Sequence, residues 1–232
     1  MKVSFYTQTI RHKGLDGIFT GWFRTRQSRE LAEWTVSLLD IQPKDRVLEI
    51  GSGSGIAVQF AARCCALGLV AGIESDPILV RRARQRNKVD ITHGRVVINT
   101  GSVSALPYPD RTFDKIFSIN CVQFWPNLLR DLRELHRVLR PEGKLLIVRQ
   151  LWDTKIRRAK AQMRDDVQQR LPQQIAMAGF DVVYSEIRLM TPSSAYCIVG
   201  SKITVETQER SAITEKRPES YLLPLRTEAE NV

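Results

Sequence analysis

The chain has 232 residues and a formal net charge of +10, with 43% hydrophobic and 26% charged residues. This length is sufficient for one large α/β domain with a substantial core. The composition excludes an intrinsically disordered chain. No apolar run reaches the roughly 18 residues of a membrane-spanning helix, and residues 1–8 lack the apolar core of a signal peptide. We therefore expect a cytoplasmic protein.

Helical and extended patterns alternate along the chain. The first predicted helix begins near residue 28 and has one apolar face, formed by Leu31, Trp34, Thr35, Leu38 and Leu39. Strands are expected near 46–50, 69–73, 95–100, 114–119, 144–149, 181–189 and 195–200. Further helices are expected near 55–67, 77–88, 127–139 and 156–178. The alternation predicts an α/β fold with a doubly wound, mostly parallel seven-stranded sheet and an antiparallel edge strand.

A glycine-rich turn follows the first predicted strand. The segment from Val47 to Gly55 reads Val-Leu-Glu-Ile-Gly-Ser-Gly-Ser-Gly. Its apolar residues are typical of a parallel strand that is buried on both faces. The glycines allow the backbone to turn sharply and to approach a ligand closely. With the helix that follows, the segment predicts a nucleotide-binding corner, and an ordinary glycine-rich turn is the alternative.

Two residues of this corner indicate the kind of nucleotide. Ile56 stands where the dinucleotide fingerprint requires a third small residue. The carboxylate of Glu49 would repel a pyrophosphate at the N-terminus of the helix. A cofactor with a cationic end would instead be attracted by Glu49. S-adenosylmethionine has such an end, because it carries a sulfonium and an ammonium group.

A second acidic residue ends the next apolar run. Glu74 follows the glycines by about 20 residues, where a carboxylate accepts hydrogen bonds from both hydroxyls of a ribose. Alternatively, Glu74 is a charge at the N-terminus of the next helix, where the helix dipole favours it. Asp76 is better suited to cap that helix because it precedes Pro77. This interpretation leaves Glu74 free for the ribose.

Over about residues 28–200 the chain resembles the class I S-adenosylmethionine-dependent methyltransferases. The likeness is greatest to the small-molecule group of type 11, which includes the menaquinone and ubiquinone methyltransferases. Four segments carry it, and their combination is specific: Val47–Gly55, Gly72–Pro77, Gly101–Asp114 and Arg137–Gly143. The resemblance implies a Rossmann-like methyltransferase fold and S-adenosyl-L-methionine as the cofactor.

The resemblance also implies roles for individual residues. Glu49 and Gly51–Gly55 would surround the methionine part of the cofactor, and Glu74 would bind the ribose. Ser102 and Val103 would border the adenine, although many relatives carry an acid where Ser102 stands. The cofactor-binding residues expected in all are Glu49, Gly51, Ser52, Gly53, Ser54, Gly55, Glu74, Ser75, Ser102, Val103, Asn120 and Gln123. No residue is identified as a catalytic base.

Asn120 and Gln123 belong to a segment that follows the fourth strand, Asn-Cys-Val-Gln-Phe-Trp. Folds of this class bind ligands at the carboxyl edge of the sheet, where both side chains can contact cofactor or substrate. Phe124 and Trp125 either wall this pocket or pack in the core. Amino-methyltransferases of nucleic acids typically carry an Asp/Asn-Pro-Pro-aromatic tetrad here. Its absence disfavours methylation of adenine N6 or cytosine N4.

Basic residues gather on two predicted helices. One cluster comprises Arg81, Arg82, Arg84, Arg86 and Lys88, and the other lies within residues 155–164. Such clusters can bind nucleic acid or an anionic membrane surface. Solvated helix faces are the favoured interpretation, because no aromatic residues alternate with the bases as in single-strand binding proteins.

The cysteines and the chain ends add little to the chemistry. Cys64 and Cys65 are adjacent on a helix, and Cys121 and Cys197 lie in apolar segments, so we expect buried reduced thiols and no metal site. The methyltransferase domain is expected over residues 28–202. The resemblance implies a lid over the substrate built by residues 1–27, with Tyr6, His12, Trp22 and Phe23 as candidates. Residues 203–232 form a polar tail.

The sequence as a whole favours methyl transfer to a small-molecule acceptor by in-line displacement. The sulfonium is already an activated leaving group, so the protein mainly holds the acceptor close to the methyl group. A base is needed only when the accepting atom is weakly acidic. The alternatives are methylation of RNA or another nucleic acid, and a regulatory protein that binds the cofactor without catalysis.

Overall fold

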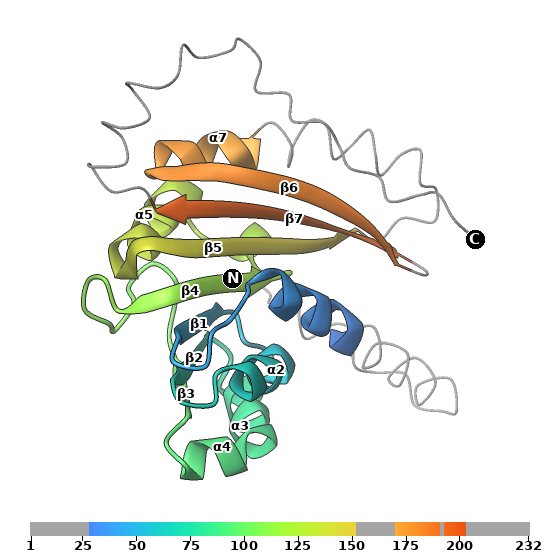
Figure 1. The fold of residues 1–232 in the computed structure, drawn as a ribbon, viewed down its shortest axis with the longest axis vertical. Helices are drawn as coiled ribbons and strands as arrows, with labels where there is room; N and C mark the ends of the chain where they lie inside the picture. Colours follow the sequence, from blue (N-terminus) through green and yellow to red (C-terminus); the bar gives the residue numbers. More distant parts are fainter. Residues whose placement is uncertain (1–27, 152–169, 191–192, 203–232) are drawn as a thin grey trace, which may run out of the picture.

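A computed structural model describes residues 28–151, 170–190 and 193–202, and their strands form one sheet (Figure 1). The strands are β1 (Arg46–Ile50), β2 (Leu69–Glu74), β3 (Val96–Thr100), β4 (Phe113–Ile119), β5 (Leu139–Leu151), β6 (Phe180–Met190) and β7 (Ser193–Lys202). They lie in the order β3-β2-β1-β4-β5-β7-β6. The order reverses direction between β1 and β4, which creates the crevice where doubly wound folds bind ligands.

The first five strands are parallel to one another. The last of the described strands, β7, lies between β5 and β6 and pairs with both in antiparallel fashion. The pair at this edge of the sheet is therefore antiparallel. The predicted fold class, a doubly wound and mostly parallel sheet of seven strands with an antiparallel edge, is confirmed.

Helices cover both faces of the sheet. They are a helix over residues 28–38, α2 (Ile56–Cys64), α3 (Pro77–Arg86), α4 (Lys88–Thr92), α5 (Leu128–Val138) and α7 (Arg170–Met177), with a short 3-10 helix η2 (Val122–Phe124). The helix over 28–38, α2 and α3 pack with one face of the sheet in one buried cluster. Helices α5 and α7 pack with the other face. The described helices contain no segment long and apolar enough to cross a membrane.

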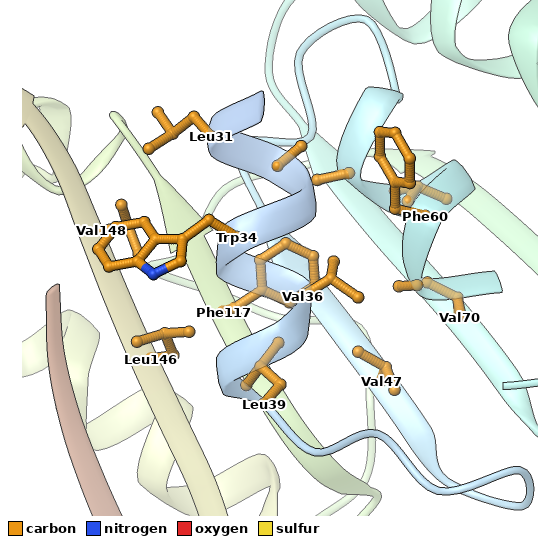
Figure 2. Packing of buried hydrophobic residues seen from close by; sticks show 14 of the residues in the cluster. Leu31, Trp34, Val36, Leu39, Val47, Phe60, Val70, Phe117, Leu146 and Val148 are labelled. Carbon is orange, nitrogen blue, oxygen red and sulfur yellow. The ribbon is translucent and has the colours of Figure 1, made fainter. Parts of the chain in front are cut away.

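The helix over residues 28–38 buries the apolar face predicted from the sequence. Leu31 and Leu39 are almost completely buried, and Trp34 is 6% exposed. Figure 2 shows the helix between Phe60 of α2 and Val148 of β5, across the face of the sheet. Each large apolar side chain removed from water contributes about 1.5–3 kcal/mol. This helix therefore stabilises the sheet on the side of α2.

Three predicted elements differ from the structure. The helix expected over 55–67 is shorter, because α2 ends at Cys64. The helix expected over 77–88 is divided into α3 and α4, because the buried side chain of Asn87 donates to the carbonyls of Ala83 and Gly55 and ends the first helix. The strand expected over 144–149 begins earlier, at Leu139. Its pairing with the neighbouring strand β4 is irregular between Phe113 and Lys115.

Several segments interpreted from the sequence lie outside the described residues. They are the lid over 1–27 with its four candidate side chains, the second basic cluster within 155–164, and the polar tail. Of the helix expected over 156–178, the structure describes only the part from Arg170 to Met177.

Candidate functional site

The glycine turn lies at the carboxyl edge of β1. The N–H groups of Gly51 and Ser52 both donate to the carbonyl of Ile73 in β2, at 2.8 and 3.1 Å. Gly51, Gly53 and Gly55 have φ values of +73°, +52° and +76°. This left-handed backbone is costly for residues with a β-carbon. The alternation of glycines is therefore required by the path of the loop.

The three glycines differ in what surrounds them. A β-carbon on Gly51 would lie 2.8 Å from the β-carbon of Cys121, and one on Gly55 would lie 2.6 Å from the side-chain nitrogen of Asn87. A β-carbon on Gly53 would have no described heavy atom within 4 Å. Packing within the protein explains the first and third glycines. Gly53 instead faces open space, which a ligand can approach.

Glu49 lies beneath this turn and is 3% exposed. Its carboxylate accepts a hydrogen bond from the backbone N–H of Val58, in the first turn of α2. The N-cap position of α2 is occupied by Gly55, which has no side chain that could accept a hydrogen bond from the helix. The other oxygen of Glu49, Oε2, is buried and has no hydrogen-bond partner among the described residues. An orphaned carboxylate oxygen of this kind calls for a donor or a cation from outside the described residues.

The electrostatic state of Glu49 supports this conclusion. Burial raises its pKa well above the ordinary value of 4.5, and the nearby charge of Glu74 raises it further. The hydrogen bond from Val58 acts in the opposite direction but is outweighed. A positive charge bound nearby would lower the pKa again. The site is therefore better suited to a cationic group than to a phosphate.

Glu74 ends β2 and is 9% exposed. One of its oxygens accepts from the N–H of Gly53 at 2.9 Å, and the other accepts from the N–H of Asp76 at 3.0 Å. The hydroxyl of Ser75 donates to the second oxygen at 3.4 Å. The expectation that Glu74 is free was therefore wrong, since it ties the glycine turn to β2. A carboxylate has about four acceptor sites, so capacity remains for a ribose hydroxyl.

The capping role assigned to Asp76 is confirmed. Its side chain accepts from the N–H of Ile78 at 2.7 Å, and Pro77 is the first residue of α3.

The loop after β3 begins beside Glu74. The N–H of Gly101 donates to the backbone carbonyl of Glu74 at 3.0 Å. Ser102 is exposed and forms an isolated bridge with Ala105. Val103 is 5% exposed and packs in the same apolar cluster as Ile73. The loop thus offers one polar and one apolar side chain at this edge.

Asn120 and Gln123 shape the turn that follows β4. Asn120 has a φ of +53°, and its Oδ1 accepts from the N–H of Gln150 at 2.6 Å. The side-chain amide of Gln123 donates to the carbonyl of Asn120 at 2.7 Å. Trp125 is buried, as its core interpretation predicts, whereas Phe124 is 52% exposed. Only Phe124 of the two aromatics presents a large apolar surface here.

The twelve predicted cofactor-binding residues come together on loops at or beside the carboxyl ends of four neighbouring strands, β1, β2, β3 and β4. Ser52 is buried and its hydroxyl has no partner among the described residues. The carbonyl of Ser54 accepts from Nε of Arg86 at 2.9 Å. The arrangement fits a nucleoside with a cationic amino-acid end. It offers two carboxylates, open space above a glycine and an apolar wall.

The sequence did not indicate three residues around the site. Cys121 was expected to be buried, but it is only partly so and lies close enough to Glu49 and Glu74 for their charges to raise its pKa further above the effect of burial. Its position next to the predicted site residue Asn120 could have indicated that Cys121 lies near the site. Asn87 and Asp131 form hydrogen bonds to loops of the site that are distant in the sequence, and no local pattern marks them.

Comparisons with known proteins identify similar chains. Residues 48–147 match the family model described as a methyltransferase domain. The putative methyltransferase YrhH of Bacillus subtilis is 31% identical over 52% of this chain and 66% of its own. The 27-O-demethylrifamycin SV methyltransferase of Amycolatopsis mediterranei is 31% identical over 50% of this chain and 43% of its own. The 2-phytyl-1,4-naphtoquinone methyltransferase of a Nostoc species is 29% identical over 55% and 56%. The chain thus spans less than two thirds of each of these relatives.

Among solved structures, an S-adenosylmethionine-dependent methyltransferase from Aquifex aeolicus matches with a TM-score of 0.63. It is 18% identical, and the match covers 74% of this chain and 89% of that one. The cyclase SpnF matches with a TM-score of 0.64 at 17% identity, over 76% and 82%. These likenesses concern the fold, which therefore hosts more than one activity.

Proposed function

Because the chain belongs to the class I S-adenosylmethionine-dependent methyltransferases, we propose that it transfers a methyl group from S-adenosylmethionine to a small-molecule acceptor. The observation that carries the proposal is the buried Glu49, whose unpartnered oxygen lies beneath a glycine turn with open space at Gly53. A cationic amino-acid end satisfies that oxygen, and Glu74 provides the acceptor for a ribose.

The residues of the chain act mainly by binding and orientation. When bound, S-adenosylmethionine supplies a methyl group on a positively charged sulfur. Glu49, with the open space at Gly53, would hold the methionine end, Glu74 would hold the ribose, and Ser102 and Val103 would border the adenine. Asn120 and Gln123 shape the wall next to the acceptor. Holding two reactants in the correct geometry can lower the activation barrier by about 7–11 kcal/mol.

A small acceptor is favoured over nucleic acid by the contacts of the basic cluster on α3 and α4. Arg84 donates twice to the carbonyl of Ile98, and Arg86 donates to the carbonyl of Ser54. Two of the five bases therefore stabilise the fold and the glycine turn. The exposed ring of Phe124 offers an apolar wall at the acceptor side. Two relatives are named as methyltransferases of small molecules, 27-O-demethylrifamycin SV and 2-phytyl-1,4-naphtoquinone.

Transfer of a labelled methyl group tests the proposal. The purified protein is incubated with labelled S-adenosylmethionine and either a metabolite extract or total RNA and DNA, at physiological salt. We expect label in the metabolite fraction. Label confined to nucleic acid would instead support the second candidate activity, and binding without any transfer would support a regulatory role. We place the reaction in the cytoplasm, which the four free thiols support.

A further inference from the structure

A buried carboxylate joins two loops that border the proposed cofactor site. Asp131 lies in the first turns of α5 and is completely buried. Its Oδ2 accepts from the N–H of Asn127 at 3.1 Å, and its Oδ1 accepts from the hydroxyl of Ser104 at 2.8 Å. Asn127 caps α5 by accepting from the N–H of Arg130 at 3.0 Å. Asp131 thus connects the start of α5 with the loop after β3.

Each of the two connected segments borders the site from a different side. Ser104 lies two residues after Ser102, and its N–H donates to the hydroxyl of Ser102 at 3.3 Å. Asn127 ends the segment that begins at Asn120 after β4. Between the serines, Val103 is buried against the end of β2. A single side chain therefore sets the position of the adenine side relative to the acceptor side.

Other residues of α5 hold the remainder of the same loop. Glu134 accepts from the N–H of Leu106 at 2.8 Å, and Arg137 donates to the carbonyl of Tyr108 at 2.9 Å. Residues 131, 134 and 137 are three apart, so they share one face of the helix. Glu134 and Arg137 also form an ion pair at 2.8 Å. The face of α5 is thus a continuous polar support for the loop.

We propose that Asp131 is a positioning residue for the adenine end of the cofactor and acts through the hydroxyl of Ser104. The inference rests on the proposed function, since it needs Ser102 and Val103 to border the adenine. A buried polar group with its hydrogen bonds satisfied specifies one arrangement of the groups that it joins. A loop held in place before the ligand arrives loses less conformational freedom on binding.

Two ligands separate this role from a general effect on the fold. S-adenosylhomocysteine contains both ends of the cofactor, whereas 5′-methylthioadenosine contains adenine and ribose but no amino-acid end. Calorimetric titration of the full chain measures the Kd of each ligand. Ser104→Ala should lower the affinity for both ligands by a similar factor of about five, as expected for the loss of one hydrogen bond. Ser104→Thr, which keeps the hydroxyl, should restore the affinity. Glu49→Gln should weaken S-adenosylhomocysteine alone.

Asp131→Asn supplies a second test, because it replaces one acceptor with a donor and should weaken both ligands at least as much. If this buried variant fails to fold, the comparison of Ser104→Ala with Ser104→Thr still tests the positioning role of Asp131. The matched control is Thr35→Ala, which removes a buried hydroxyl that donates to the backbone carbonyl of Leu31 at 2.7 Å, on a helix away from these loops. It should lower the Tm and leave both affinities unchanged.

The outcomes separate the two levels of inference. If the unaltered protein binds neither ligand, the proposed function fails and this inference fails with it. If the unaltered protein binds both and Ser104→Ala binds them equally well, only the role of Asp131 is overturned. An equal loss of affinity in Thr35→Ala would also overturn it, because the effect would then be a general loosening of the fold.

Discussion

The carboxylate of Glu49 opposes folding of the free protein and favours binding. Its pKa in the folded state is raised above the unfolded value by burial and by Glu74. A group of this kind contributes stability below its unfolded pKa, and that contribution is lost as the pH rises through the raised folded value. Ionisation of Glu49 in the free protein is therefore unfavourable, whereas a cationic ligand compensates for it.

Glu49→Gln should stabilise the free protein and weaken cofactor binding. The amide keeps an acceptor for Val58 and removes the buried charge. As the pH rises above the ordinary pKa of 4.5, the Tm of the variant should increasingly exceed that of the wild type, because only the wild type has a carboxyl at position 49 to ionise. Affinity for S-adenosylmethionine should fall about tenfold or more, the size of one charge-assisted hydrogen bond. Unfolding scans and calorimetry measure the two effects, and unchanged affinity would contradict the role.

Gly53→Val should prevent cofactor binding in a protein that still folds. The side chain would enter the open space above the turn and would strain a backbone with a φ of +52°. Gly94→Val is the matched control, because Gly94 has a φ of +71°, a similarly open surrounding, and a position before β3 at the opposite edge of the sheet. Both variants should lose about 1–3 kcal/mol of stability. Only Gly53→Val should lose binding of S-adenosylhomocysteine. An equal loss in both variants would contradict the proposal that the cofactor occupies the open space at Gly53.

Glu74→Gln should weaken cofactor affinity about tenfold, because the ribose hydrogen bond loses its charge assistance. Glutamine keeps one acceptor, so part of the contact with Gly53 and Asp76 remains. Asp76→Ala is the control. It removes the cap of α3 and should cost about 1 kcal/mol of stability without a change in affinity. Wild-type affinity in Glu74→Gln, measured by calorimetry, would show that Glu74 only holds the turn.

At the scale of elements, α5 is held at its C-terminal end by Lys202. The ammonium group donates to the carbonyls of His136 and Leu139, at 2.6 and 2.8 Å, and so satisfies two groups at the end of the helix. The ring of His136 packs edge-on against Phe180. Burial lowers the pKa of His136 below 6.5, and the charge of Lys202 lowers it further.

His136 should make the stability of the fold sensitive to mild acid. Because its folded pKa is lowered, its contribution is present above the unfolded pKa and is lost as the pH falls through the folded value. The unfolding free energy of the wild type should therefore fall below about pH 6.5. His136→Phe should lack that part of the decline, and Lys202→Met should raise the pKa of His136, followed by NMR titration. A decline unchanged in His136→Phe would assign it to other groups.

The local patterns predicted the elements well but predicted the contacts between them poorly. The strands and the glycine turn were found because periodicity and backbone conformation are properties of neighbouring residues. The division at Asn87 was missed, because it depends on the carbonyl of Gly55, which lies 32 positions away in the chain. The tie between Glu74 and Gly53 was missed for the same reason. Asp131 could not be recognised, since its partner Ser104 comes from another loop.

At the scale of the whole molecule, a ligand that binds only the folded state stabilises it in proportion to its affinity. S-adenosylhomocysteine at about 100 times its Kd should add roughly 2.7 kcal/mol. For a chain of this size that corresponds to a rise in Tm of about 5–10 °C. NAD should produce no such rise, because Glu49 disfavours its pyrophosphate. A larger rise with NAD in the same unfolding scan would contradict the assignment of the cofactor.

The position of β7 has a consequence for how the chain is made. Synthesis proceeds from the N-terminus, and segments begin to pair as they emerge. All four loops of the proposed site are complete once β5 has been synthesised at Leu151. The outer edge of β5, however, has to wait for residues 193–202, and β6 joins the sheet only through β7. A nascent chain therefore contains all loops of the proposed cofactor site before β6 and β7 can complete the sheet. Cofactor that binds at this stage can stabilise the correctly paired, incomplete sheet.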